Sequence, residues 1–110
     1  MRQIHKEEVH GLGIDPETRC DHWHGESDII AIKLKCCGLW FPCFECHGAV
    51  ADHVSKVWSK VESDALAILC GGCGYQLAIS EYFDCGSACP ACHRAFNPGC
   101  ANHYHLYFEV

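Results

Sequence analysis

The stretch "ALAILCGGCGYQLAI", residues 65–79, places two cysteines in a tight turn between two apolar segments. Residues 65–69 and 75–79 are short apolar runs bounded by turn residues, which predicts two β-strands. Gly74, directly after Cys73, relieves the steric demand of the turn. A strand, a C-x-x-C turn and a second strand form the knuckle of a rubredoxin-like zinc ribbon. The stretch therefore predicts a metal-binding β-hairpin.

A second C-x-x-C pair completes this pattern. Fifteen residues separate Cys73 from Cys89, within the C-x2-C-x15-20-C-x2-C spacing of a four-thiolate zinc site. Each pair supplies two sulfurs from one turn whose amides can face the thiolates. The predicted ligands of this site are Cys70, Cys73, Cys89 and Cys92.

The first half of the chain holds eight further candidate ligands. Residues two apart, or in a C-x-x-C turn, reach a common tetrahedral metal easily. One predicted set is Cys20, His22, Cys43 and Cys46, and the remaining set is Cys36, Cys37, His47 and His53. The two sets interleave along the sequence, so crossed metal chelates, more than a large core, would hold this half together.

Two strings allow other chemistries. "CFECH" (43–47) and "CPACH" (89–93) both spell C-x-x-C-H, the attachment motif of c-type haem, but haem would leave most cysteines unused. "CPAC" also permits a thiol redox role, although no helical pattern follows it, because "HRAFNPGC" runs into a turn. Zinc is the favoured ligand, and thiol redox chemistry stays an alternative.

Composition bounds the class of protein. The chain has 110 residues, eleven cysteines and nine histidines. One domain of this size buries about two thirds of its unfolded surface, so cross-links have to assist a modest core. The N-terminal residues contain no apolar signal segment, which favours a reducing compartment and metal over disulfides. The net charge of -6 disfavours nucleic acid, with an RNA-binding zinc knuckle kept as an alternative.

The fold class expected is a small metal-stabilised, mainly β domain with little helix. Residues 1–18 are predicted to be a polar, mobile lead-in, with room for an edge strand at its end, followed by a zinc-knuckle lobe (19–60) and a ribbon-like lobe (64–110). In the first lobe "DIIAIKLK" (28–35) alternates like a half-buried strand. The segment 49–65 fits a short helix as well as a connector. Ser80 can cap one helical turn, and the aromatic-rich 104–110 is predicted to be a strand.

Some candidate ligands remain unassigned. They form a possible fourth site, or are packing residues without metal: Cys85, Cys100, His103 and His105.

With these residues laid out, the sequence resembles the CHY-type zinc finger family. The family's opening C-x-H-Y appears as "CDHW", with Trp23 in place of tyrosine. The "CC" pair, "CxxCH" with a following "DH", and the two later C-x-x-C pairs appear in the family's order, over about residues 20–108. Some members are fused to RING domains in ubiquitin ligases. This chain resembles the stand-alone kind, similar to a fungal intermembrane-space factor that assists assembly of small translocase chaperones.

These observations predict a zinc-binding accessory protein with three zinc ions, or four, acting through protein contact or zinc and thiol exchange. No enzymatic activity is expected, because each proposed set closes with four ligands, whereas a zinc hydrolase keeps an open position. A protein partner is expected, and no membrane span. The predicted location is the cytoplasm, with the mitochondrial intermembrane space as the alternative for a eukaryotic host.

Overall fold

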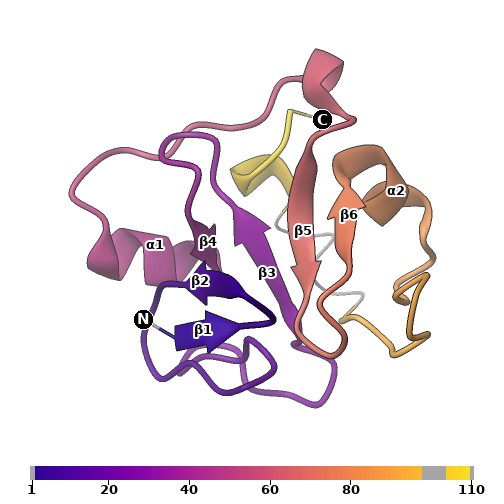
Figure 1. Ribbon diagram of the computed structural model, residues 1–110. Helices are drawn as coiled ribbons and strands as arrows, with labels where there is room; N and C mark the ends of the chain where they lie inside the picture. Colours follow the sequence, from indigo (N-terminus) through magenta and orange to yellow (C-terminus); the bar gives the residue numbers. More distant parts are fainter. Residues whose placement is uncertain (1, 98–103, 110) are drawn as a thin grey trace.

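One six-stranded sheet organises the protein (Figure 1). The computed structural model describes residues 2–97 and 104–109. The strand order is β1-β2-β4-β3-β5-β6, and only the β2–β4 pair is parallel. The strands are β1 (Arg2–Ile4), β2 (Glu7–Val9), β3 (Ile30–Lys33), β4 (Trp40–Phe41), β5 (Leu66–Cys70) and β6 (Gln76–Ala78); the helices are α1 (Phe44–Val50), the 3-10 helix η1 (Lys60–Glu62) and α2 (Ile79–Asp84). The predicted class, mainly β with little helix, is confirmed.

The two lobes meet in the middle of this sheet. Strand β3 of the first lobe pairs with β5 of the second, with Ala31 opposite Leu69. Both residues are fully buried, and their neighbours Ile30 and Ile32 are buried too. The central strands are therefore covered on both faces, unlike the half-buried strand that the alternating pattern of 28–35 predicts.

The N-terminal residues provide one of these covers. The prediction of a mobile lead-in over residues 1–18 differs from the structure, in which β1 and β2 form a hairpin in the sheet. Ile4 and Val9 are buried and pack with Ala31, Trp40 and Leu69. Burial of these side chains removes apolar surface from water and fixes the hairpin against the sheet.

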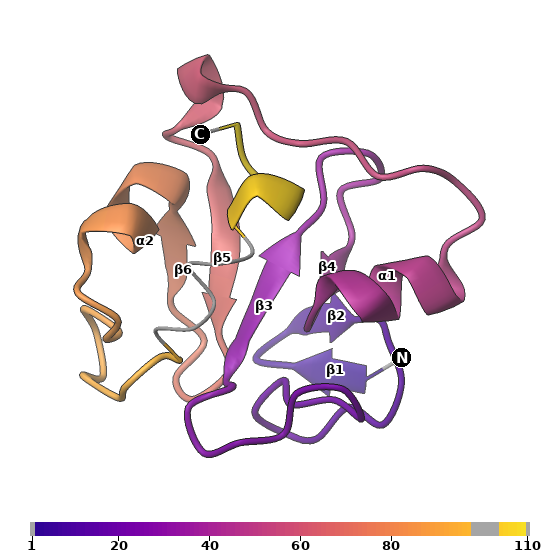
Figure 2. The ribbon, with the colours of Figure 1, turned by 180° about the vertical axis from the view of Figure 1, so that it is seen from behind.

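The other face carries α1, α2 and the C-terminal residues (Figure 2). The prediction of a strand over 104–110 is wrong for the described residues, because 104–106 form a 3-10 turn and only Phe108 makes an isolated bridge, to Trp58. Tyr104 and Tyr107 are three residues apart, a spacing that places both rings on one side of such a turn. Both rings pack against this core, with Tyr107 itself buried.

Candidate metal centres

Cysteine and histidine side chains gather into three groups of four. Within each group the ligand atoms lie within 4.8 Å of one another. Site 1 is Cys20, His22, Cys43 and Cys46; site 2 is Cys36, Cys37, His47 and His53; site 3 is Cys70, Cys73, Cys89 and Cys92. The structure thus brings together all twelve residues that the sequence singles out, in the same three sets.

Site 1 is built around the start of α1. Cys43 is the N-cap of this helix, and its sulfur accepts a hydrogen bond from the Cys46 amide at 3.4 Å. The Cys20 and Cys43 sulfurs are 3.6 Å apart, and His22 Nδ1 lies 3.4 Å from both Cys43 and Cys46. A tetrahedral zinc with Zn–S of about 2.3 Å and Zn–N of about 2.0–2.1 Å places two sulfurs about 3.8 Å apart and sulfur and nitrogen about 3.6 Å apart. The separations in site 1 fit that tetrahedron.

Site 2 uses the next residue of the same helix. His47 is buried beneath Phe41, while Cys46 beside it belongs to site 1. The Cys36 and Cys37 sulfurs are 3.8 Å apart, and Cys36 Sγ lies 3.3 Å from His47 Nε2. The two imidazole Nε2 atoms of site 2 are 3.3 Å apart. One short helix therefore carries ligands of two adjacent sites.

The fourth ligand of site 2 has an outer partner of its own. His53 Nδ1 lies 3.2 Å from a carboxylate oxygen of Asp52. Metal-bound histidines usually donate their second ring N–H to such a group, which fixes the tautomer that leaves Nε2 for the metal. The "DH" dipeptide thus has the arrangement of a ligand and its orienting carboxylate.

Site 3 lies at the end of the central hairpin. Cys70 ends β5, and its amide N–H donates a hydrogen bond of 2.9 Å to the Tyr75 carbonyl, which closes the turn that holds Cys73. Sulfur separations across the two C-x-x-C pairs are 3.8 Å (Cys70 to Cys92) and 3.7 Å (Cys73 to Cys89). These distances are far above the 2.05 Å or so of a disulfide and match the edges of a zinc tetrahedron.

Burial makes the thiol groups dependent on a cation. Burial raises the pKa of Cys70 and of Cys46, because an anionic sulfur is poorly solvated there. In site 1 a hydrogen bond from Cys43 lowers the pKa of Cys20 to about 5, and the same bond raises the pKa of Cys43. Several thiolates can share such a volume only when a metal ion balances their charge.

The N-terminal hairpin and the residues directly after it support two of the sites, a role that sequence reasoning missed. Gly11 has φ +150°, and a β-carbon there would lie 2.8 Å from the Cys46 sulfur. The neighbouring Leu12 amide points at the same sulfur, at 3.5 Å. At site 3, His5 Nε2 lies 2.9 Å from the Gly71 carbonyl oxygen. The sequence marks this support only by glycines near the N-terminus, none of which stands beside a predicted metal ligand.

An ion pair ties the N-terminal segment before site 1 to site 3. Arg94, two residues after Cys92, donates to the carboxylate of Glu17, with a second bond of 3.3 Å from Nη2 to Oε1. This contact holds the pKa of Glu17 below its ordinary value. Glu17 also accepts from Arg19, directly before the site 1 ligand Cys20. Sites 1 and 3 are thus joined through one charged cluster.

The structure describes only two of the four candidate ligands of the possible fourth site, Cys85 and His105. Cys100 and His103 lie outside the described residues. Cys85 donates its S–H to the Tyr82 carbonyl at 3.1 Å, and His105 is exposed. Among residues 2–97 and 104–109, sites 1 to 3 are the groups with metal-ligand geometry.

A small β domain with three tetrahedral Cys/His groups is a metal-stabilised protein of the zinc-finger class. The chain belongs to the CHY zinc finger family, whose match covers residues 20–97, and it is a zinc-binding protein. Comparison with curated proteins finds "Helper of Tim protein 13" of Saccharomyces cerevisiae, 40% identical over 92% of this chain and 90% of that protein. The protein of the same name from Kluyveromyces lactis is 37% identical, over 96% and 91%. An uncharacterized protein of Schizosaccharomyces pombe is 36% identical over 92% and 88%. No solved structure matches the chain.

Proposed function

We propose that each of sites 1, 2 and 3 holds one zinc ion, and that the chain is a non-enzymatic accessory factor in the assembly of other proteins. The observation that carries the zinc assignment is the set of ligand separations, all close to the edges of a zinc tetrahedron. The name of the relatives supports the accessory role, and by similarity the clients of this chain are Tim proteins.

The closed geometry of the sites supports a role without catalysis. A catalytic zinc keeps one coordination position for water or substrate, whereas each site here offers four Cys or His ligand atoms. Zinc in such a site contributes folding free energy, on the order of 10 kcal/mol apparent per structural site. Its first effect is therefore to hold the two lobes in one fold.

Exchange of zinc is the second way in which such a protein can act on a client. Site 2 is the best placed for it, because His53 is 34% exposed and lies in the irregular segment after α1. Cys36 and Cys37 are half-buried, so a competing thiol can approach them. We therefore place zinc or thiol exchange at site 2, and a purely structural role at site 3.

The location proposed for this chain is the mitochondrial intermembrane space. The sequence predicts the cytoplasm, with the intermembrane space as the alternative for a eukaryotic host. The Tim-related name of the relatives favours the alternative. Within the described residues, no helix has the length and apolar character needed to cross a membrane. Fractionation of the host cell, with the chain tagged at its C-terminus, checks the location.

Two measurements test the function. Native mass spectrometry of the purified protein should show three zinc ions per chain, and fewer than three would overturn the assignment. Depletion of the chain from its host should lower the amount of assembled Tim complexes. Re-expression of the His53→Ala variant should restore assembly only in part if exchange at site 2 matters, whereas the exposed control His24→Ala should restore it fully.

A further inference from the structure

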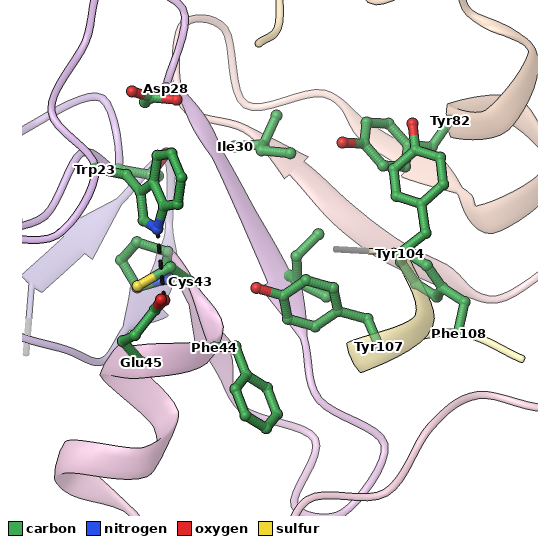
Figure 3. A pocket seen from close by; sticks show the side chains of 13 residues that line it. Trp23, Asp28, Ile30, Cys43, Phe44, Glu45, Tyr82, Tyr104, Tyr107 and Phe108 are labelled. Carbon is green, nitrogen blue, oxygen red and sulfur yellow. Dashed lines mark hydrogen bonds between the residues drawn. The ribbon is translucent and has the colours of Figure 1, made fainter. Parts of the chain in front are cut away.

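A hollow lies beside site 1, on the sheet face that carries α1 and α2 (Figure 3). It encloses about 40 Å³ of free space, compared with the roughly 10–15 Å³ that one water molecule needs. Six aromatic rings line it, and we call it the aromatic pocket: Trp23, Phe44, Tyr82, Tyr104, Tyr107 and Phe108.

The aromatic pocket has two walls that come from the two halves of the chain. Trp23 and Glu45 form one wall, with the indole Nε1 donating to the carboxylate at 3.4 Å. The tyrosines form the other, and Figure 3 shows the Tyr107 hydroxyl pointing toward the Trp23 side. Ile30 and Ile32 of β3 lie buried between the walls. The floor is thus dry and fixed by the sheet, while the Trp23 wall is exposed.

Charge distinguishes the aromatic pocket from an ordinary apolar hollow. Two carboxylates, Asp28 and Glu45, belong to its lining, and the described lining contains no lysine, arginine or histidine. Asp28 is held in place, since its two oxygens accept bonds of 2.8 Å from Gly25 and Asn97. Glu45 is exposed at the mouth. Aromatic faces and carboxylates together attract cations, through the ring quadrupole and through direct ion pairing.

We propose that the aromatic pocket binds an arginine side chain presented by a segment of a partner protein, with the guanidinium against the aromatic walls and its charge facing Glu45. Arginine fits better than lysine, because its planar head stacks on aromatic rings, is weakly hydrated and matches a carboxylate with two donors. The net charge of -6 steers a basic segment toward the chain. This inference concerns recognition of a partner and does not depend on zinc exchange.

Nuclear magnetic resonance titration tests the proposal directly. The probes are two blocked pentapeptides of glycine and serine, one with a central arginine and one with citrulline, its neutral analogue. The arginine peptide should shift the Trp23 indole N–H in a saturable way. The Trp40 and Trp58 indoles, which donate to Glu7 and to the Lys33 carbonyl outside the pocket, should not respond. Loss of the charge should weaken binding by about fivefold or more.

Matched variants separate the aromatic pocket from the general charge of the protein. Glu45→Gln should weaken binding of the arginine peptide by about fivefold, and Glu8→Gln, at an exposed position of β2, should leave it unchanged. Tyr104→Leu removes a ring from the opposite wall, away from every metal ligand, and should also weaken binding. Equal affinity for both peptides, or equal effects of Glu45→Gln and Glu8→Gln, would overturn the proposal. Zinc is counted on each variant, so that weaker binding is not confused with loss of the site 1 metal. If Glu45→Gln releases that metal, the affinity of the Tyr104→Leu variant decides the test.

Discussion

Site 2 and site 3 show two ways of using four ligands in one small domain. Site 3 ends the central hairpin: Cys70 is fully buried and pairs across the sheet with Ile30. Site 2 lies beside the sheet, and among its ligands only His47 is buried. Its last ligand, His53, follows α1 in a segment without regular structure. A ligand on a paired strand, as Cys70 is, is held by the fold, whereas a ligand on an irregular segment, as His53 is, depends more on the metal itself.

Because of this difference, loss of zinc should have different consequences at site 3 and at site 2. Removal of zinc from site 3 frees the end of β5 and exposes the contact between the two lobes. Removal from site 2 frees the segment around 51–57, where Val54 is already 86% exposed. The first change unfolds the domain, and the second leaves most of the sheet intact.

Loss of site 3 should have the largest effect. Cys70→Ser removes a buried ligand at the centre of the sheet, and with it stabilisation on the order of 10 kcal/mol. We expect a chain without cooperative thermal unfolding and with fewer bound zinc ions. Cys85→Ser, which alters a half-buried cysteine outside the three sites, is the matched control and should keep three zincs. A Cys70→Ser protein that still unfolds cooperatively would contradict the proposed difference between sites 2 and 3.

His47→Ala should be the next most damaging change. It deletes a buried side chain beneath Phe41, and the lost packing alone should cost about 3–5 kcal/mol. It also removes one ligand of site 2, and the loss of that zinc adds to the cost. The zinc count should fall by one while site 3 keeps its metal and the sheet persists. Thermal unfolding and native mass spectrometry measure both effects. Loss of the site 3 zinc in this variant would show that the two halves are not independent.

The pH dependence of zinc affinity should differ between the two sites. Burial raises the pKa of Cys70 and Cys73, so these thiols hold protons at neutral pH and zinc must displace them. Burial lowers the pKa of His47, so this ligand is already neutral and releases no proton. Site 3 binds zinc through four thiols and site 2 through two, so affinity should fall more steeply at site 3 than at site 2 on acidification from neutral pH. Competition titrations at two pH values measure the slopes, and equal slopes would contradict the assignment of ligands.

The smallest effect concerns the hairpin that supports site 3. Gly74 has φ +86°, and an added β-carbon would lie 2.8 Å from the β-carbon of His5. Gly74→Ala should destabilise the fold by at least about 1–2 kcal/mol. Gly48→Ala is the control, because nothing lies within 4 Å of that position in α1 and alanine favours helix by about 0.5–1 kcal/mol. Denaturant unfolding should therefore show opposite signs for the two variants.

The spacing of cysteines and histidines in the sequence predicts most of the metal sites. A C-x-x-C turn restricts two sulfurs to one metal, so the spacing predicts the three groups in which the structure places the twelve residues. The "CFECH" stretch, with Cys46 in site 1 and His47 in site 2, follows from the interleaved order of the two sets. The central β-hairpin follows from its apolar runs.

The edges of the fold could not be predicted in this way. Strands β1 and β2 have three residues each, too few to show a period of two, and only Ile4 and Val9 mark their buried side. The C-terminal aromatic residues alternate like a strand, but 104–106 form a 3-10 turn, and Tyr104 and Tyr107 each pack against Phe108 and the core over the sheet. Such contacts depend on partners distant in sequence, which local patterns do not contain.

Stepwise removal of zinc by chelators of increasing affinity, followed by native mass spectrometry and by amide hydrogen exchange on the same samples, tests the central claim most directly. The account predicts that the first zinc leaves while β3 and β5 remain protected, and that newly exposed amides lie around 36–37 and 47–57. The last zinc should leave only as the sheet unfolds. Release of all zinc ions in one step with global unfolding, or first exposure at 70–73 and 89–92, would contradict it.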